Sequence, residues 1–231
     1  MGREAGVDYF NRRHPLHWIK VRAALSARRR MYERVIQYIR PDAAMRIVDV
    51  GATPDTIIPY NNFFERWYPY AAQVTVCSIE DCTPLESAFP GVVSRQIRGQ
   101  NLPFEDATFD WALCFAVLEH AGNRARQRHL LAECARIADG FIAYTPNRYF
   151  PLEMHTLLPF THWLPARWHR ALWRSLGMRF WAREENLNLL SLADAYTILP
   201  TEGVARVHLL RFAGWPSNIE IVWRRRGAVR C

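Results

Sequence analysis

Gly51, at the end of the stretch "MRIVDVG", is the residue of this sequence whose type and position most directly predict chemistry. A strand that ends in glycine lets a ligand approach the backbone, because no Cβ stands in the way and the N–H groups of the turn become available. A nucleotide-like ligand fits such a turn. A dinucleotide fingerprint needs G-x-G-x-x-G, however, and Gly51 is the only glycine of this turn. A pyrophosphate cofactor, and with it a nicotinamide dehydrogenase, is therefore poorly supported.

Two carboxylates follow roughly thirty residues later, in "SIEDC". They come at the end of a second β-rich run, where a carboxylate can accept two hydrogen bonds from ribose hydroxyls. The alternative is that one of them caps the helix that follows. We expect Glu80 to bind ribose, with Asp81 as the second candidate.

The elements that must position these residues follow from the hydrophobic pattern. Short β-rich runs alternate with longer segments, which predicts a mostly parallel sheet with crossover helices. Near the far end, "ARVHLLRF" and "SNIEIVWRRR" flank "AGWP" and predict a hairpin. The five runs are "MRIVDVG", "QVTVCSI", "GVVSRQI", "FDWALCFA" and "GFIAYTP".

Two further segments flank this core. Residues 1–41 form a leader in which "VRAALSARRRMYERVIQYI" has the spacing of an amphipathic helix, ended by Pro41 and Asp42. Residues 148–195, between the fifth run and the hairpin, are dense in aromatics, prolines and histidines. We expect this insertion to roof the end of the sheet where ligands bind. The whole chain, 1–231, is predicted to be a single domain.

Composition excludes several classes of protein. No run approaches the roughly 18 apolar residues that cross a bilayer, and the start, "MGREAGVDYFNRRHP", lacks the apolar stretch of a secretory signal, so we expect a cytoplasmic protein. The five cysteines form no C-x-x-C pair and mostly sit in apolar runs, which favours buried thiols over disulfides or zinc. They are Cys77, Cys82, Cys114, Cys134 and Cys231.

A formal net charge of +8 is compatible with nucleic acid, with an acidic small substrate or with an anionic membrane surface. Lys20 is the only lysine, so the arginine bias can reflect genome composition rather than a selected surface. Charge alone therefore does not select a partner, and nucleic acid is not favoured.

Four stretches, in this order and spacing, resemble the class I S-adenosylmethionine-dependent methyltransferases, especially the broad bacterial type 11 group. They are "IVDVG", "SIED", "NLPFEDATFDWALCFAVLEH" and "TPN", of which the L-P-F…F-D…L-E-H block is the most specific. The resemblance runs from about Met45 to Asn147. It implies an α/β, Rossmann-like sheet of seven strands, mostly parallel with the last strand antiparallel, and helices on both faces. It also implies methyl transfer from S-adenosyl-L-methionine.

The resemblance also implies roles for individual residues. Asp49 and Gly51 correspond to the positions around the methionine portion of the cofactor, and Glu80 to the ribose-binding acid. Arg98 stands where such enzymes often hold adenine with an aspartate, so adenine recognition is expected to rest on Gln100 or on backbone groups of the same turn, which includes Asn101. Phe115 and Ala116 are expected beside the methionine moiety and the transferable methyl.

The turn "GATPD" departs from the family, because Thr53 and Asp55 replace two small residues. One account begins a helix at Thr53, with Pro54 at its first position. The second begins the helix at Asn62, with Glu65 closing a capping box, and makes "ATPDTIIPYN" an ordered loop over the cofactor. We favour the second, because Pro59 would interrupt the first helix. Asp55 then either pairs with the cofactor's ammonium or faces solvent.

Methyl transfer from a sulfonium is an in-line displacement that needs two aligned reactants and no obligatory metal. A hydroxyl, amine or carbon-acid acceptor must lose a proton to a base. Glu119 and His120 follow the fourth strand at the ligand end of the sheet, and histidine is a common general base. The structural alternatives are that Glu119 caps or packs a helix and that His120 bonds backbone.

The insertion offers further candidates. Glu153, His155 and His162 are alternative bases, and their spacing matches no metal-binding pattern. Tyr144 and Asn147, which bracket the end of the fifth strand, are expected to position the acceptor, although Asn147 also suits a plain turn. The stretch "LPARWHRALWRSLGMRFW" interleaves arginines with aromatics, as in a lid helix with its apolar side packed down or in a helix that contacts a membrane.

Three functions remain after these arguments. The leading one is a methyltransferase for a small-molecule, glycan or lipid-linked acceptor. An RNA methyltransferase is supported by charge, but "TPNRYF" is not the N-P-P-Y/F motif of base-amine methylators. A binding or scaffold protein that keeps the fold and has lost the cofactor would explain the departures in "GATPD" and at Arg98.

Overall fold

The computed structural model describes residues 17–227. Its first element is helix α1 (His17–Ile39). Met31, Val35 and Ile39 lie on one stripe of this helix and are buried against the sheet. The helix ends before Pro41, as its sequence predicts.

Seven strands form one sheet in the order β3-β2-β1-β4-β5-β7-β6. All neighbouring pairs from β3 to β5 are parallel, and β7 is antiparallel to both β5 and β6. The predicted α/β sheet with one antiparallel strand and a closing hairpin is confirmed. The strands are β1 (Ile47–Val50), β2 (Val74–Ser78), β3 (Val93–Gln96), β4 (Phe109–Phe115), β5 (Ala138–Pro146), β6 (Gly203–Phe212) and β7 (Trp215–Arg225).

The central strands are buried on both faces, so their sequences are nearly continuous apolar runs rather than alternating apolar and polar residues. All four residues of β1 are buried. Strand β6, at one edge of the sheet, instead alternates between exposed and partly buried residues.

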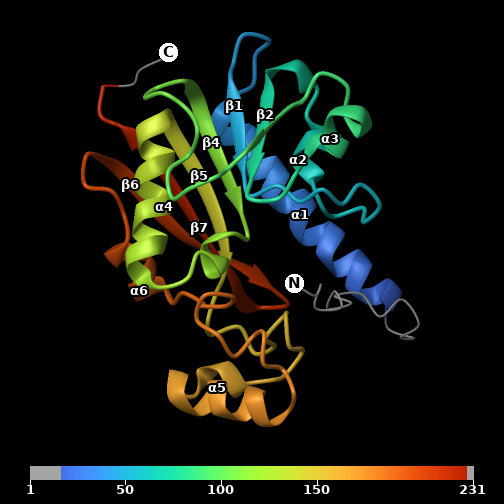
Figure 1. The fold of residues 1–231 in the computed structure, drawn as a ribbon, viewed down its shortest axis with the longest axis vertical. Coiled ribbons are helices and arrows are strands. Elements are labelled where there is room, and N and C mark those ends of the chain that lie inside the picture. Colours follow the sequence, from blue (N-terminus) through green and yellow to red (C-terminus); the bar gives the residue numbers. More distant parts are fainter. Residues whose placement is uncertain (1–16, 228–231) are drawn as a thin grey trace.

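Helices cover both faces of the sheet (Figure 1). On one face, α4 (Arg124–Ile137) and α6 (Leu192–Thr197) pack on Val48, Ala112 and Phe141. On the other, α1, α2 (Phe63–Trp67) and α3 (Thr83–Ala88) pack on Ile47, Val76 and Leu113. The chain also forms the short 3-10 turns η1 (Ala71–Gln73), η2 (Leu118–His120) and η3 (Thr161–Trp163).

The segment from Arg148 to Ser191 lies beyond the carboxyl ends of β4 and β5 (Figure 1). It contains η3 and α5 (Ala166–Ser175) and is otherwise irregular. A small core of its own holds it together, built from Trp173, Trp181, Ala182, Leu187 and Leu189. A bridge between Asn147 and Leu190 returns the chain to the sheet.

Two composition-based expectations can be compared with this fold. Within residues 17–227, none of the helices combines the length and the apolar character that crossing a membrane requires. Cys77, Cys82, Cys114 and Cys134 are buried free thiols, as expected, and burial raises the pKa of each. Cys231 and residues 1–16 of the predicted leader lie outside the described residues.

Candidate active site

The crevice for a ligand lies where the strand order reverses, between β1 and β4. The chain leaves β1 toward β2 and leaves β4 toward β5, so their carboxyl ends open a gap. Gly51 begins the turn after β1 with φ +90°, and its N–H donates to the Cys77 carbonyl at 2.7 Å. A Cβ on Gly51 would stand 2.3 Å from a methyl carbon of Val117. Both conformation and space therefore require glycine here.

A pocket of about 70 Å³ opens at this point. Its walls come from α1, from the end of β1, from the loop that precedes α2 and from the end of β4. The lining residues are Arg28, Asp49, Gly51, Ala52, Thr53, Tyr60, Asn61, Asn62, Phe63 and Phe115.

The pocket holds a cation and a carboxylate. Arg28 reaches it from α1, with its guanidinium 5.3 Å from the Phe63 ring centre. Burial lowers the pKa of Arg28, and the nearby charges of Glu119 and Asp49 oppose that shift. A cation and an acid in one pocket complement the carboxylate and the ammonium of an amino acid.

Asp49 is buried beside a second acid, Glu65 of α2. Burial raises the pKa of Asp49 well above its usual value, and the neighbouring carboxyl of Glu65 raises it further, while Arg28 lowers it. Two adjacent buried carboxyls cannot both ionise at low cost, so ionisation of one disfavours ionisation of the other.

The loop before α2 is ordered by its own side chains. Asn62 donates to the carbonyls of Thr53 and Asp55, both at 2.8 Å, and accepts from the Thr53 N–H at 3.3 Å. The helix begins after Asn62, as the favoured account predicts. The capping box was wrong, because Asn62 is left-handed with φ 46°, its side chain makes no cap bond, and Glu65 turns toward Asp49.

Asp55 is engaged inside this loop. Its carboxylate accepts from the N–H groups of Ile57 and Ile58 and from the Asn61 amide at 2.7 Å. These bonds give Asp55 a turn-forming role. Its pairing with a cofactor ammonium stays a prediction.

The residues predicted to hold ribose and adenine follow β2 and β3 along the same edge. Glu80 is exposed at the bend after β2. Asp81 accepts from the N–H and hydroxyl of Thr83 in the turn before α3, whose N-cap is Cys82 without a side-chain cap bond, so the capping alternative is not confirmed for this acid. Gln100 is exposed, and Asn101 contacts the His129 ring at 3.0 Å. The cofactor roles of these residues stay predictions.

Phe115 forms the wall on the side of β4. Its ring meets Phe63 edge-on at 4.7 Å and stacks on Tyr144 at 5.7 Å. Tyr144 is buried and donates its hydroxyl to Glu220 of β7 at 2.5 Å. Asn147 is buried too, and its amide donates to the Pro216 carbonyl. Both side chains therefore hold the end of β5 together, and their contact with an acceptor stays a prediction.

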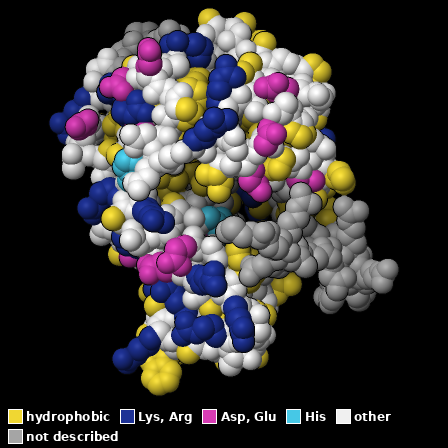
Figure 2. Space-filling view, viewed as in Figure 1, with side chains coloured by type: hydrophobic (Ala, Val, Ile, Leu, Met, Phe, Trp, Pro, Cys, Tyr) yellow, Lys and Arg dark blue, Asp and Glu magenta, His cyan; other side chains and the backbone are white. Residues whose placement is uncertain are grey.

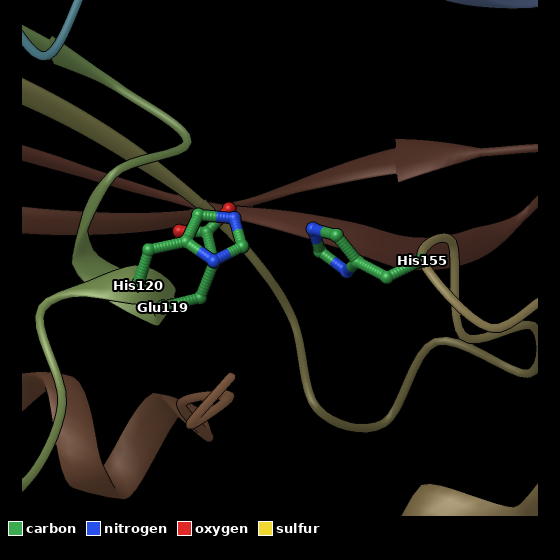
Figure 3. Close-up of side chains that lie close together, drawn as sticks. All are labelled: Glu119, His120 and His155. Carbon is green, nitrogen blue, oxygen red and sulfur yellow. The ribbon is translucent and has the colours of Figure 1, made fainter. Parts of the chain in front are cut away.

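Glu119, His120 and His155 come together beyond Phe115 (Figure 3). One potential ligand atom from each lies within 4.8 Å of the others. The two imidazoles are edge-on, with ring centres 4.9 Å apart. His155 comes from the insertion, so the sequence alone could not place it beside η2. His162 lies elsewhere, bonded to the Phe150 carbonyl, and burial lowers its pKa.

Sequence reasoning missed the site roles of Arg28, which lines the pocket, and of Glu65, which is buried beside Asp49. For Arg28 a signal existed, since it precedes the buried Met31 by three residues and Val35 by seven, on the same helix face. An arginine on a buried stripe indicates a buried partner. For Glu65, the spacing of a capping box gave a competing explanation.

The comparisons with known proteins agree with this geometry. Residues 63–142 match the sequence profile of the family described as Methyltransferase domain, a match that begins after the glycine turn. No curated protein matches the chain.

Three solved structures illustrate the structural likeness. A protein of Pyrococcus horikoshii OT3 has 11% identity, a TM-score of 0.57 and coverage of 95% of either chain. An S-adenosylmethionine-dependent methyltransferase of Mesorhizobium loti has 14% identity and a TM-score of 0.55, covering 83% of this chain and 96% of that one. The geranyl diphosphate C-methyltransferase of Streptomyces coelicolor has 12% identity and a TM-score of 0.57, covering 92% of this chain and 85% of its own.

At such low identity these structures establish the fold alone. Residues 63–142 match a methyltransferase domain, and the chain has the fold of the solved S-adenosylmethionine-dependent methyltransferases to which it is similar.

Proposed function

We propose that the pocket between β1 and β4 binds the methionine part of S-adenosylmethionine, and that the chain transfers the cofactor's methyl group to a small-molecule, glycan or lipid-linked acceptor in the cytoplasm. The observation that carries the proposal is the pairing of Arg28 with Asp49 in one pocket. The cofactor's carboxylate would bind Arg28, and its ammonium would bind Asp49.

The rest of the cofactor would follow the carboxyl edge of the sheet from β1 toward β3. Glu80 would accept the ribose hydroxyls, since it is exposed at the end of β2. Gln100 and Asn101 would contact adenine. Their turn is fixed from below, because the buried Glu133 accepts from the Leu102 N–H at 2.8 Å.

The methyl group would then lie near Phe115. Methyl transfer requires alignment and exclusion of water, which the aromatic wall of Phe63, Phe115 and Tyr144 supplies. An acceptor that carries a proton must lose it. Glu119 and His120 lie just past Phe115 and are the groups we assign to that step.

The insertion supports an acceptor with a lipid part. Figure 2 shows arginine and apolar side chains gathered on the lobe that contains α5. Trp168 and Leu176 are 59% and 52% exposed, whereas Trp173 on the same helix is 1% exposed. Part of the helix thus packs as a lid, and the remaining aromatic and arginine residues suit a membrane interface.

The test is calorimetric titration with S-adenosylmethionine and S-adenosylhomocysteine. Arg28→Gln should weaken binding about 10- to 100-fold, the worth of a charge-assisted bond, and Glu80→Ala should weaken it too. Arg29→Gln is the matched control, because Arg29 is exposed on the same helix, forms its ion pair with exposed Glu33 and is not among the residues that line the pocket. Its affinity should equal that of the unaltered chain.

No binding at millimolar cofactor would contradict the proposal. The contact of Val117 with Gly51 would then indicate a closed pocket, in a fold kept for binding or scaffolding. Equal losses in Arg28→Gln and Arg29→Gln would show that charge near α1, and not a contact in the pocket, sets the affinity.

A further inference from the structure

The Glu119 side chain is the starting point, because its carboxylate is fully buried and only half satisfied. Its relative exposure is 0%. One oxygen, Oε2, accepts from the Thr145 hydroxyl at 2.9 Å. The other, Oε1, is buried without a hydrogen-bond partner among the described residues. A buried carboxylate oxygen is costly unless a cation or a donor compensates it.

Two imidazoles face this carboxylate, and each is oriented by a bond on its other nitrogen. The Nδ1 of His120 lies 2.6 Å from the Asn186 carbonyl, and the Nδ1 of His155 lies 2.7 Å from the Glu153 carboxylate. Since a carbonyl or carboxylate accepts from Nδ1–H, each neutral ring keeps a lone pair on Nε2. Figure 3 shows the His155 ring facing the His120 ring, with the Glu119 carboxylate beside His120.

Glu153 is itself fixed, because it is buried and also accepts from the backbone N–H groups of His155 and Thr156. A carboxylate that orients a histidine is the usual support of a metal-binding imidazole. Two histidines and one carboxylate are the ligand set of open zinc and other divalent-metal sites.

From this geometry we propose that Glu119, His120 and His155 bind a divalent metal ion such as Zn²⁺, and that its open position binds the acceptor through a hydroxyl oxygen. Metal bonds of about 2.1 Å place tetrahedral ligand atoms about 3.4 Å apart. The three ligand atoms now lie within 4.8 Å of one another, so they must move closer together to bind the metal. His120 is exposed on a single 3-10 turn and is the side chain freest to move.

The acceptor part of this inference rests on the proposed function. The metal would lower the pKa of the bound hydroxyl, whose proton passes to water. An oxygen lone pair then forms the bond to the methyl carbon while the carbon–sulfur bond breaks, and its electron pair stays on sulfur as the neutral thioether of S-adenosylhomocysteine. Glu119 and His120 would thus promote deprotonation as ligands. Phe115 lines the cofactor pocket and η2 (Leu118–His120) follows it closely along the chain, so the cluster lies close to that pocket.

The first test measures Zn²⁺ binding to tag-free, chelator-treated protein by competition with a chromophoric chelator. The unaltered chain should bind one ion, and His120→Asn, His155→Asn and Glu119→Gln should each weaken binding at least tenfold. Glu153→Gln should weaken it about 10- to 100-fold, as loss of a supporting carboxylate does. His208→Asn is the matched control, because His208 is exposed on β6. Thermal unfolding of each variant checks its fold. Because His120 is exposed, His120→Asn is the variant least expected to misfold.

If the unaltered chain binds no zinc, the metal site is overturned. Equal zinc affinities of His120→Asn and His208→Asn would overturn it too. The acceptor part is tested with catechol, a probe with two hydroxyls, which should bind the zinc-loaded chain and neither the metal-free chain nor His155→Asn. If catechol does not bind the zinc-loaded chain, the proposal that an open coordination position binds a hydroxyl oxygen is wrong. Titration of the same unaltered chain with S-adenosylhomocysteine separates the two proposals. A chain that binds zinc but not S-adenosylhomocysteine would count against the proposed function alone.

Discussion

The two sides of the crevice are built in different ways. On the cofactor side, the loop after β1 is ordered by bonds between near neighbours in sequence, such as Asn62 to Thr53, nine residues apart. On the acceptor side, His120 bonds Asn186 across 66 residues, and His155 comes from the irregular insertion. The strand ends and the loop after β1 thus define the first side, and the insertion between β5 and β6 helps to define the second.

The comparison predicts that the two sides are energetically separate, and the strongest perturbation tests this. Trp173→Ala empties the core of the insertion and removes a bond from the indole N–H to the Thr161 hydroxyl. It should destabilise this segment by about 3–5 kcal/mol, the usual cost of truncating a buried tryptophan. Hydrogen exchange of residues 150–190 measures the effect. Trp168→Ala on the exposed face should change stability by less than about 0.5 kcal/mol.

The affinity of Trp173→Ala for S-adenosylhomocysteine should stay within about twofold of that of the unaltered chain, since the pocket lining contains no residue of the insertion. A tenfold loss would mean that the insertion also shapes the cofactor side, and the contrast between the two sides would fail.

Gly51→Ala perturbs the cofactor side alone. The added methyl meets Val117 at 2.3 Å, and φ +90° strains any side chain. S-adenosylhomocysteine should bind about 100-fold more weakly, or about 2.8 kcal/mol, by calorimetry. The control is Gly99→Ala, where nothing lies within 4 Å of the new Cβ and φ is not positive. Unaltered affinity in Gly51→Ala would show that the turn can shift without closing the pocket.

Asn62→Ala should have a smaller effect, because it removes bonds within the loop and leaves the strands intact. Loss of its two donated bonds to Thr53 and Asp55 should lower the free energy of unfolding by about 1–3 kcal/mol. Asn61→Ala, which loses one bond to Asp55, should cost less. Denaturant unfolding ranks the two variants, and the reverse order would argue against Asn62 as the residue that orders the loop.

The last prediction concerns pH. Burial raises the pKa of Asp49, so its contribution to stability is complete below the unfolded pKa of about 3.9 and is lost as pH rises through the raised folded pKa. The unfolding free energy should fall across that window, and Asp49→Asn should flatten the fall. Arg28 opposes the shift but does not cancel it. A steeper fall in Asp49→Asn would contradict the assignment.

The sequence predicted the fold well because the sheet rests on local patterns. The runs that became β1 to β5 are apolar and short, and the hairpin is marked by its turn. Gly51 and the start of α2 were also predictable, since a strand-end glycine and Pro59 each constrain the backbone directly. The site was only partly predictable. His155 reaches Glu119 through irregular chain, whose path depends on packing around Trp181 and not on any sequence period.

The anchoring of α1 has a consequence for biosynthesis. Arg34 of this helix donates through Nε to Glu220 of β7 at 2.6 Å, and Tyr144 and Tyr38 bond the same carboxylate. The two ends of that ion pair are 186 residues apart. A ribosome therefore releases Arg28 long before it releases the strand that holds its helix in place. Nascent chains should not retain cofactor until β7 has emerged, so cofactor capture by this protein marks the completion of its sheet.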